Sequence, residues 1–437
     1  MVIEKLVLKN FGPIKNVTLE VKDYTILIGT TSSGKSTVAK LISIFKSVEF
    51  LLLGNSRDFW SKKFQDYNID FTLKKATRIS YFWDDLFFEL TFSDIRTNID
   101  FKNMPLALGR IDGLWQVPFA SSESSNTSRI SLGLALNTLK FFVPEGEQRE
   151  SLSQLGNHYK KDLEALDSGL WERIHNLYTA KDSESREFLE QVNLKNRPLT
   201  ELREPLYFPA ERILMSMVGN SILGLLRNNV SLPECIKTFG SEYELSRNNV
   251  KQLPIEFLNA DYLNEKGASW LRIGKQKLKL EQSSSGFQSI VPLIVVLNNY
   301  RSRNDSLKRY LVIEEPELNL YPTTQKHLLQ HIVECVNYLN TRLLITTHSP
   351  YVLTVFDNLI QAQNAFIAHP EREQEIKNIV PKEQWINWDR VSCYYFDKGT
   401  CRSTLNHEFR TLGSSAIDEI SIEIGKEFDL LTDIQYI

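Results

Sequence analysis

Nine residues near the start of the chain, GTTSSGKST at 29–37, limit most strongly what this sequence can fold into. The apolar run Tyr24–Ile28 precedes them and is typical of a buried strand, and apolar residues from Val38 to Val48 follow with helical spacing. Residues 29–36 fit GxxxxGK[ST], whose glycines let backbone N–H groups and the N-terminus of the next helix point at phosphate oxygens. The sequence therefore predicts a strand, a phosphate-binding loop and a helix, with an ordinary strand–helix turn as the alternative.

The residue types within this loop indicate what each would bind. We expect the Lys35 ammonium to reach the β- and γ-phosphates of a nucleotide and the Ser36 hydroxyl to ligate Mg²⁺. The residues expected to hold the nucleotide are Gly29, Thr30, Thr31, Ser32, Ser33, Gly34, Lys35, Ser36 and Thr37.

Two consecutive carboxylates end another apolar run, in LVIEEPELNLYP at 311–322. An acidic strand end opposite the loop can hold Mg²⁺ and handle the attacking water, so we assign Glu314 to the metal. Because side chains alternate along a strand, Glu315 is expected on the other face, toward water, as the catalytic base. Such a base contributes about 10²–10⁴-fold to rate. The alternative is a solvated acidic turn, which would be costly at the end of a buried strand without nearby cations.

A third apolar run, in TRLLITTHSP at 341–350, ends in two threonines and His348. Since His348 stands at the end of the next predicted strand, we expect it to hydrogen-bond the γ-phosphate or the attacking water. A histidine with a purely structural role is the alternative.

The stretch QSSSGFQSI at 282–290 has the composition of a flexible linker. It runs directly into the apolar segment IVPLIVVL at 290–297, which predicts a helix. Composition favours a linker, whereas the segment that follows favours an anchored loop at the start of that helix.

The wider pattern of the chain predicts strands that alternate with helices. Hairpins are expected around Gly12-Pro13 and around Gly399, and aromatic residues at 70–120 predict further strands that cover one face. Residues 145–205 predict a compact helical insertion, WLRIGKQKLKLE at 270–281 alternates again, and Ala416–Leu431 predicts a last helix. Together these elements predict an α/β sandwich with a mixed sheet and antiparallel pieces at both ends.

The formal net charge of −3 over 437 residues gives no overall basic field, so nucleic acid would have to bind at a local patch. The alternating Lys275, Lys277 and Lys279 could contact phosphates, although an exposed strand face also explains them. The first residues lack the pattern of a secretory leader, and no apolar run approaches the roughly 18–20 residues that cross a bilayer. We therefore expect a cytoplasmic protein that does not bind membranes.

The cysteines match neither a zinc knuckle nor a CxxC redox pair, so reduced structural thiols are expected at Cys235, Cys335, Cys393 and Cys401. His327, His331 and Cys335 recur at helical spacing and could hold a metal. The competing interpretation is that they flank the apolar stripe of that helix.

Four segments resemble, in their order along the chain, the motifs of ABC-type ATPases of the SMC/RecF/OLD group, where OLD stands for overcoming-lysogenization-defect. They are the loop at 29–37, SSSGFQ, IEEPE and TTHSP. The opening VIEKLVLKNFGPIKNVTLEV is similar to their first hairpin, and the resemblance covers residues 1–50 and 270–355. YFPAERI at 207–213 resembles a segment of the phage-defence branch, which makes Glu211 and Arg212 candidates without an assigned role.

This resemblance implies an ABC-type P-loop ATPase head with ATP and Mg²⁺ as cofactors. It implies an N-terminal lobe at 1–140 with an antiparallel β subdomain, a helical insertion at 141–205 and a C-terminal lobe at 206–437. Two departures stand out: Glu314 occupies a position where Asp is more common, and the glutamine of the Q-loop is not placed, with Gln65 and Gln116 as candidates.

By the same resemblance, QSSSGFQSI is the signature motif. Ser284 matches the serine whose hydroxyl touches the γ-phosphate, and Ser285 and Gly286 match the two glycines. In this group the signature of one copy closes over the P-loop nucleotide of another, which implies an ATP-dependent dimer or higher homo-oligomer.

The resemblance also implies an ATPase that regulates a separate effector, such as a nuclease or toxin, in antiviral defence. The Toprim nuclease domain that OLD members often carry is not expected here, because the residues after TTHSP show no metal-binding carboxylate pattern. The alternative is a RecF- or SMC-like DNA repair or recombination ATPase that clamps DNA. The ATPase of a membrane transporter is the least favoured hypothesis.

Overall fold

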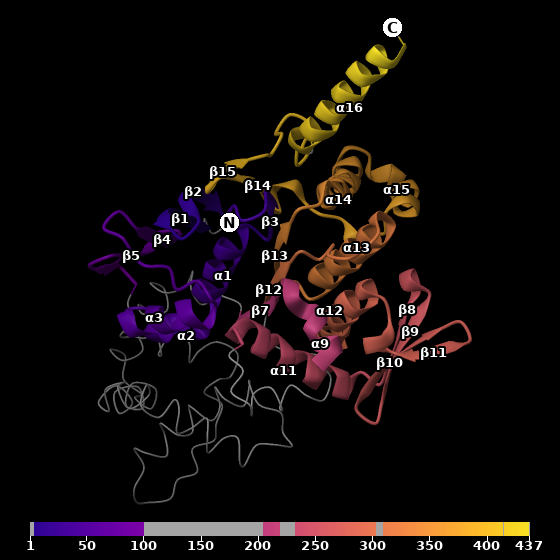
Figure 1. The fold of residues 1–437 in the computed structure, drawn as a ribbon, viewed down its shortest axis with the longest axis horizontal. Coiled ribbons are helices and arrows are strands. Elements are labelled where there is room, and N and C mark those ends of the chain that lie inside the picture. The colour runs from indigo at the N-terminus through magenta and orange to yellow at the C-terminus, as the bar shows by residue number, and fades with distance from the viewer. Residues whose placement is uncertain (1–3, 100–203, 219–231, 303–308, 414, 437) are drawn as a thin grey trace, which may run out of the picture. The chain divides into compact units, whose positions relative to one another are not determined.

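The structure, a computed structural model, describes residues 4–99, 204–218, 232–302, 309–413 and 415–436 (Figure 1). The chain divides into two compact units: Met1–Phe50, Asn55–Asn98 and Arg203–Ile437 form the first, and Leu51–Gly54 and Ile99–Leu202 form the second. Nearly all of the described residues belong to the first unit. The helical insertion predicted at 141–205 lies outside the described residues, except that its last two residues begin strand β7 (Glu204–Phe208).

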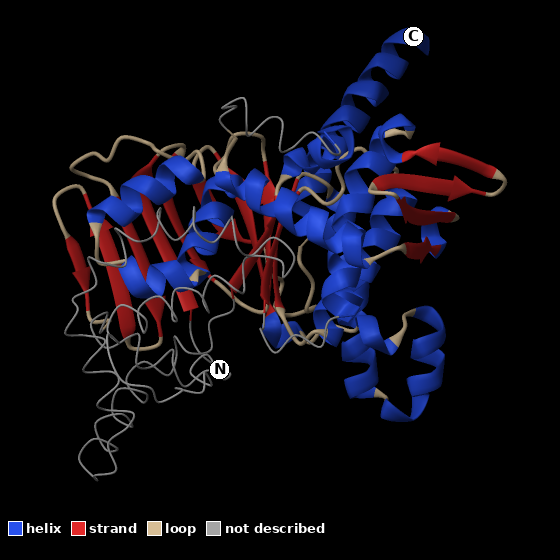
Figure 2. Cartoon of the chain, turned by 90° about the horizontal axis from the view of Figure 1, so that it is seen from below, coloured by secondary structure: helices blue, strands red, loops and turns tan. Residues whose placement is uncertain are grey.

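Among the described residues, an eleven-stranded mixed sheet runs through the first unit (Figure 2). Its order is β6-β5-β4-β1-β2-β15-β14-β3-β13-β12-β7, and the neighbours from β14 to β7 are all parallel. The strands are β1 Glu4–Phe11, β2 Ile14–Glu20, β3 Tyr24–Gly29, β4 Arg78–Trp83, β5 Leu86–Thr91, β6 Ile95–Thr97, β7, β12 Arg309–Glu314, β13 Arg342–Thr347, β14 Val391–Asp397 and β15 Thr400–Ser403. The predicted mixed α/β fold is confirmed.

The central parallel strands are buried along almost their whole length. Burial is continuous over Tyr24–Ile28 in β3, and over the last five residues of both β12 and β13. Continuous apolar runs are expected of parallel strands that are covered on both faces. Because the carboxyl ends of parallel strands meet at one edge of the sheet, the ends of β3, β12 and β13 come together.

The prediction that strands at 70–120 cover one face is wrong for the described part of that range. β4 pairs with β1, β5 with β4 and β6 with β5, all antiparallel, so these strands extend the edge of the sheet. The pairing is favoured because the outer strand of the β1–β2 hairpin would otherwise leave N–H and C=O groups unpaired. The aromatic side chains pack on helix α1 (Lys35–Lys46), where Phe45 stacks on Tyr81 with ring centroids 4.4 Å apart.

The hairpin around Gly399 is confirmed and joins the large sheet, with β14 lying parallel to β3 and β15 antiparallel to β14. WLRIGKQKLKLE, in contrast, contributes two strands to a separate four-stranded antiparallel sheet in the order β11-β10-β9-β8. Its strands are β8 Gln252–Ile255, β9 Ala260–Glu265, β10 Ala268–Ile273 and β11 Gln276–Lys279. The strands at 252–279 therefore form a second sheet, in addition to the large mixed sheet that was predicted.

The helix predicted after the phosphate loop is α1, which packs against β3, β7, β12 and β13 and ends before Val48. The predicted last helix is α16 (Ser415–Tyr436), which is longer than expected. The other α-helices in the described ranges are α2 Val48–Leu53, α3 Arg57–Asp66, α9 Leu214–Val218, α11 Glu234–Asn249, α12 Ser285–Ser302, α13 Pro322–Tyr338, α14 Pro350–Ala368 and α15 Glu373–Ile379. Short 3-10 helices also occur, among them η1 at Ala210–Ile213. In the part of the chain that the structure describes, no helix is long and apolar enough to cross a membrane.

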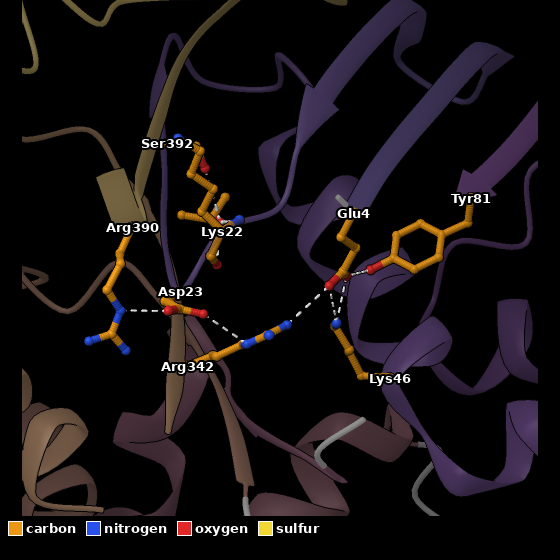
Figure 3. A network of polar contacts seen from close by, with 9 residues as sticks. Glu4, Lys22, Asp23, Lys46, Tyr81, Arg342, Arg390 and Ser392 are labelled. Atoms are coloured by element: carbon orange, nitrogen blue, oxygen red, sulfur yellow. Dashed lines mark hydrogen bonds and ion pairs between the residues drawn. The ribbon is translucent and has the colours of Figure 1, made fainter. Parts of the chain in front are cut away.

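A polar network joins the antiparallel strands to the amino ends of the parallel strands (Figure 3). Glu4 in β1 pairs with Lys46 at the end of α1 at 2.5 Å, and both side chains are 2% exposed. Arg342 at the start of β13 reaches Glu4 at 3.3 Å and Asp23 at 2.9 Å. Asp23 also accepts a hydrogen bond from Arg390, and the Tyr81 hydroxyl donates to Glu4. The network therefore fixes the hairpin strands to the sheet at the end opposite the phosphate loop.

Candidate active site

The phosphate loop leaves β3 at Gly29, directly beside β14. Gly29 has a φ of 147°, and a Cβ atom there would overlap the carbonyl oxygen of Phe396 in β14. The Thr30 N–H donates to that same oxygen at 3.1 Å. Only glycine allows the two backbones to approach this closely. Gly34, with a φ of 102°, then caps α1, so the predicted order of strand, loop and helix is confirmed.

The remaining loop residues line the turn into α1. Thr31, Ser32 and Ser36 are exposed, whereas Ser33 and Thr37 are buried. The Ser33 hydroxyl donates to the Thr30 carbonyl at 2.7 Å and so stabilises the turn. Loop N–H groups and exposed hydroxyls at the N-terminus of a twelve-residue helix suit an anionic phosphate. That these residues bind nucleotide stays a prediction.

Lys35, the first residue of α1, points back across this loop. Its ammonium donates to the carbonyls of Gly29 and Thr30, both at 2.9 Å, and lies 3.3 Å from Nε2 of His348. Burial lowers the pKa of Lys35 to about 8, although carboxylates at the end of β12 favour its charged form. The ammonium is thus at the centre of the loop, where the predicted phosphate contact needs it.

Glu314, the last residue of β12, is buried near Ser36. Burial raises the pKa of its carboxyl group, and hydrogen bonding with Ser36 opposes that shift. Its Oε1 has no hydrogen-bond partner among the described residues, although the side chain is almost wholly inaccessible. A buried orphan carboxylate oxygen beside a hydroxyl is an all-oxygen donor set of the kind Mg²⁺ prefers. Ser36 and Glu314 therefore fit a magnesium ion, which would supply positive charge to nucleotide phosphates.

Tyr207 is a neighbour of Glu314 that the sequence patterns did not single out. Tyr207 pairs with Val312 in the parallel strands β7 and β12. Val312 is two residues before Glu314, so the side chains of Val312 and Glu314, and with them Tyr207, lie on the same face of the sheet. The pKa of Tyr207 is raised well above its usual value, first by burial and then by the Glu314 carboxylate. The hydroxyl therefore stays protonated beside the carboxylate that would hold the metal.

Glu315 lies just beyond the end of β12 and does not continue its pleat. Strand alternation, from which its position was predicted, therefore does not determine where its side chain lies. Its φ of 41° turns the backbone out of the strand, and its N–H donates to the Thr346 carbonyl at 2.9 Å. The carboxylate is directed to His348, with Oε1 3.3 Å from Nε2. Glu315, His348 and Lys35 thus lie in one contiguous cluster, as the assignment of catalytic residues requires.

Glu317 is a second residue that the sequence analysis left without a role. Its Oε1 accepts hydrogen bonds from the His348 backbone N–H at 2.8 Å and from the Thr347 hydroxyl at 2.7 Å. Two donors on one carboxylate oxygen fix the turn that carries His348. The signal was present as the third acid of the IEEPE box.

The stretch QSSSGFQSI is not a linker, because α12 begins within it at Ser285. Ser284 and Ser285 are exposed, and their hydroxyls make no hydrogen bond among the described residues. A Cβ atom on Gly286 would lie 3.0 Å from the Asn319 carbonyl oxygen. A side chain at Gly286 would therefore crowd the loop that follows Glu315, which is a reason for glycine in addition to the predicted close approach of a nucleotide.

The other sequence candidates lie outside this cluster. Gln65 is exposed on α3, and Gln116 lies outside the described residues. His327 is exposed and Cys335 is buried, and the described part of the chain contains no group of three or more His, Cys, Asp or Glu side chains that could hold a metal ion. The four cysteines are unpaired thiols, as expected.

Two of the three alternating lysines have carboxylate partners in their own sheet or next to it. Lys277 pairs with Glu265 at 2.5 Å and Lys279 with Glu281 at 3.3 Å. The Lys277 ammonium also lies 4.9 Å from the centre of the Trp270 ring. This local pairing favours a solvated strand face over a phosphate-binding stripe.

Comparison with known proteins places the chain in a family. Residues 1–353 match the family described as the AAA ATPase domain. No curated protein matches the chain.

Solved structures that are similar include the Smc head domain from Pyrococcus yayanosii, with 13% identity, a TM-score of 0.35 and coverage of 94% of this chain and 98% of that chain. The SMC head domain from Thermotoga maritima is 11% identical, with a TM-score of 0.34 and coverage of 92% of this chain and 98% of that chain. An ATP-binding cassette of an ABC transporter in its ADP conformation is 12% identical, with a TM-score of 0.33 and coverage of 97% of this chain and 99% of that chain.

Proposed function

The chain belongs to the AAA ATPase domain family and is an ATPase, and from that premise we propose that it is an ABC-type head that pairs with a second copy around ATP and regulates a separate effector. In this proposal the loop at 29–37 and Lys35 hold the phosphates, and Ser36 and Glu314 hold Mg²⁺. Glu315 accepts the proton of the attacking water, and His348 orients it or contacts the γ-phosphate.

The observation that carries the pairing is the state of the signature stretch. Ser284 and Ser285 stand exposed at the start of an eighteen-residue helix, with hydroxyls that no described residue engages. Exposed hydroxyls at the start of a helix are accessible to a partner that arrives from outside, and a phosphate is the ligand that a helix N-terminus favours. We propose that this phosphate belongs to the nucleotide on the P-loop of a second copy.

We further propose that the effector is a nuclease or toxin and that the pair acts in antiviral defence in the cytoplasm. The support is the resemblance of YFPAERI to a segment of the phage-defence branch, together with the unpaired cysteines, which suit a reducing compartment. The alternative of a DNA clamp gains no support from Lys277 and Lys279, whose partners are nearby carboxylates.

A mixing experiment tests the shared active site. Lys35→Ala destroys the P-loop but leaves the signature intact, whereas Ser284→Arg blocks the signature but leaves the P-loop intact. Each protein alone should be inactive. Their equimolar mixture should recover up to about a quarter of the wild-type ATPase rate, since half of the dimers are mixed and each holds one intact site. A mixture as inactive as its two components would contradict the proposal.

A further inference from the structure

Arg212, in the YFPAERI segment, is a fully buried arginine whose hydrogen bonds all go to backbone carbonyls. It is 0% exposed and lies in η1, just beyond the end of β7. Its Nε donates to the Ser289 carbonyl at 3.1 Å, and its Nη1 to the carbonyls of Glu314 at 2.7 Å and Pro209 at 3.3 Å. Its Nη2 donates to the Glu315 carbonyl at 2.7 Å. The guanidinium fork thus joins three segments that are distant in the sequence.

The charge of Arg212 is maintained in this buried position. Burial lowers its pKa to about 10, and the carboxylates of Glu317, Glu315, Glu314 and Glu211 act in the opposite direction. The guanidinium is therefore protonated at neutral pH. A buried charge that bonds only to carbonyls is costly unless its donors are well satisfied, so this geometry depends on the planar fork of arginine.

One arm of the fork holds the turn that carries the proposed base. Glu315 has a φ of 41°, a conformation that a side chain with a Cβ atom adopts at a cost. Its N–H is held by the Thr346 carbonyl and its C=O by Arg212. Both sides of the strained residue are therefore fixed.

The other arm holds the start of the signature helix. Ser289, which accepts from Nε, is the fifth residue of α12. One residue earlier, Gln288 accepts a hydrogen bond from Ser216 of α9 at 3.2 Å, and its Nε2 donates to the Ser283 carbonyl at 2.8 Å. The first turns of α12 are thus attached to the segment that contains Arg212, with Ser284 at their exposed end.

We propose that Arg212 is a positioning residue that makes the Glu314-Glu315 turn and the start of α12 move as one unit. The state of the phosphate site in a chain thereby sets how that chain presents Ser284 to the second copy. This coupling rests on the proposed function, because Ser284 matters only if a second copy uses it. Arg212 itself need not touch the nucleotide.

The test uses Arg212→Lys, which keeps the charge but loses the fork. Its affinity for a fluorescent ATP analogue should stay within about twofold of wild type, because the P-loop is intact, while turnover falls at least about tenfold. Arg301→Lys is the matched control: Arg301 tethers the far end of the same helix through Glu334 at 2.7 Å, and its replacement should leave turnover nearly unchanged.

Mixing Arg212→Lys with each of the other variants then shows whether Arg212 positions both the base and the signature or only one of them. If Arg212 positions both the base and the signature, Arg212→Lys should not be rescued by Lys35→Ala or by Ser284→Arg. Rescue by either partner, to the level that those two proteins give each other, would overturn the proposal. If the mixture of Lys35→Ala with Ser284→Arg is itself inactive, the shared site fails, and the coupling must be judged within one chain.

Hydrogen exchange on Ser284→Arg makes that judgement without altering Arg212. ATP should slow exchange at 285–290 as well as at 314–320, and both effects should vanish when Lys35→Ala is added to the same chain. Protection confined to the P-loop and to 314–320 would overturn the coupling, even if the mixing experiment supports the shared site.

Discussion

Nε2 of His348 lies 3.3 Å from a carboxylate oxygen of Glu315. The same nitrogen lies 3.3 Å from the Lys35 ammonium, so one imidazole links the proposed base to the phosphate loop. An unprotonated nitrogen accepts from the ammonium, and a protonated one donates to the carboxylate. In the proposed function, this contact would couple the occupancy of the phosphate site to Glu315.

Glu315→Gln should abolish turnover while retaining ATP. The amide keeps the size of the side chain but cannot accept the proton of water, so we expect a loss of about 10²–10⁴-fold in kcat. The bound nucleotide should then hold two copies together, so the mass in solution should double with ATP and not with ADP. Steady-state turnover and light scattering measure the two effects.

The matched control for this substitution is Glu371→Gln, at an exposed glutamate that pairs with His369 at 3.1 Å away from the cluster. It should turn over ATP normally. Hydrolysis by Glu315→Gln at the wild-type rate would show that another group is the base.

Glu317→Ala should impair turnover by releasing His348. It leaves the exposed His348 N–H and the buried Thr347 hydroxyl without their acceptor, and an unpaired buried group such as this hydroxyl costs about 1–3 kcal/mol. We expect kcat to fall about tenfold or more while the affinity for ATP changes little, because no P-loop contact is lost.

Glu317→Gln separates geometry from charge at the same position, because its amide oxygen can still accept from both donors. It should recover most of the turnover that Glu317→Ala loses. Equal losses in the two variants would mean that the negative charge of Glu317, and not its hold on His348, is what matters.

The parts of the site that follow from sequence are those that a short segment determines alone. A glycine-rich loop between a strand and a helix predicts that Lys35 and Ser36 begin a helix, and the apolar run before the carboxylates predicts that Glu314 ends a strand; the structure has them there. Parallel pairing then brings the end of β13, with His348, beside them. Each inference needs only local periodicity and the rule that parallel strands end at one edge.

The remaining relationships depend on contacts between distant parts of the chain. Arg212 bonds carbonyls 102 and 103 residues away, and no local pattern predicts a carbonyl as its partner. Gly29 has no room for a side chain because the Phe396 carbonyl of β14, more than 360 residues further along the chain, lies against it. Glu315 lies off its predicted pleat face because its φ of 41° turns the chain out of β12, and its carbonyl there accepts a hydrogen bond from the distant Arg212. In each case tertiary packing decides what the sequence pattern leaves open.

Lys46→Met should destabilise the fold without altering the phosphate site. It leaves the buried Glu4 carboxylate with Arg342 and Tyr81 but without its closest cation, which we expect to lower the free energy of unfolding by about 3 kcal/mol. Thermal unfolding measures the change.

The surface pair of Lys377 with Glu373, in which both side chains are about one-third exposed, provides the control for Lys46→Met. Lys377→Met should shift the unfolding free energy by less than about 1 kcal/mol, because surface pairs contribute little. Equal effects of the two substitutions would show that the buried network adds nothing beyond a surface pair.

Binding of ATP should weaken as the pH rises through about 8, the pKa to which burial lowers Lys35. Phosphate charge raises the pKa of Lys35 in the complex, so the complex holds the proton more tightly than the free protein. Affinity is therefore highest below pH 8 and falls about tenfold per pH unit above it, until the pKa of the complex is reached. At pH 8, binding should take up about half a proton per nucleotide, which calorimetry in buffers of different ionisation enthalpy measures.

Lys35→Arg keeps its charge throughout this range, so its affinity for ATP should not depend on pH above 8. If wild type and Lys35→Arg lose affinity in parallel between pH 8 and 9, the proton belongs to a group other than Lys35.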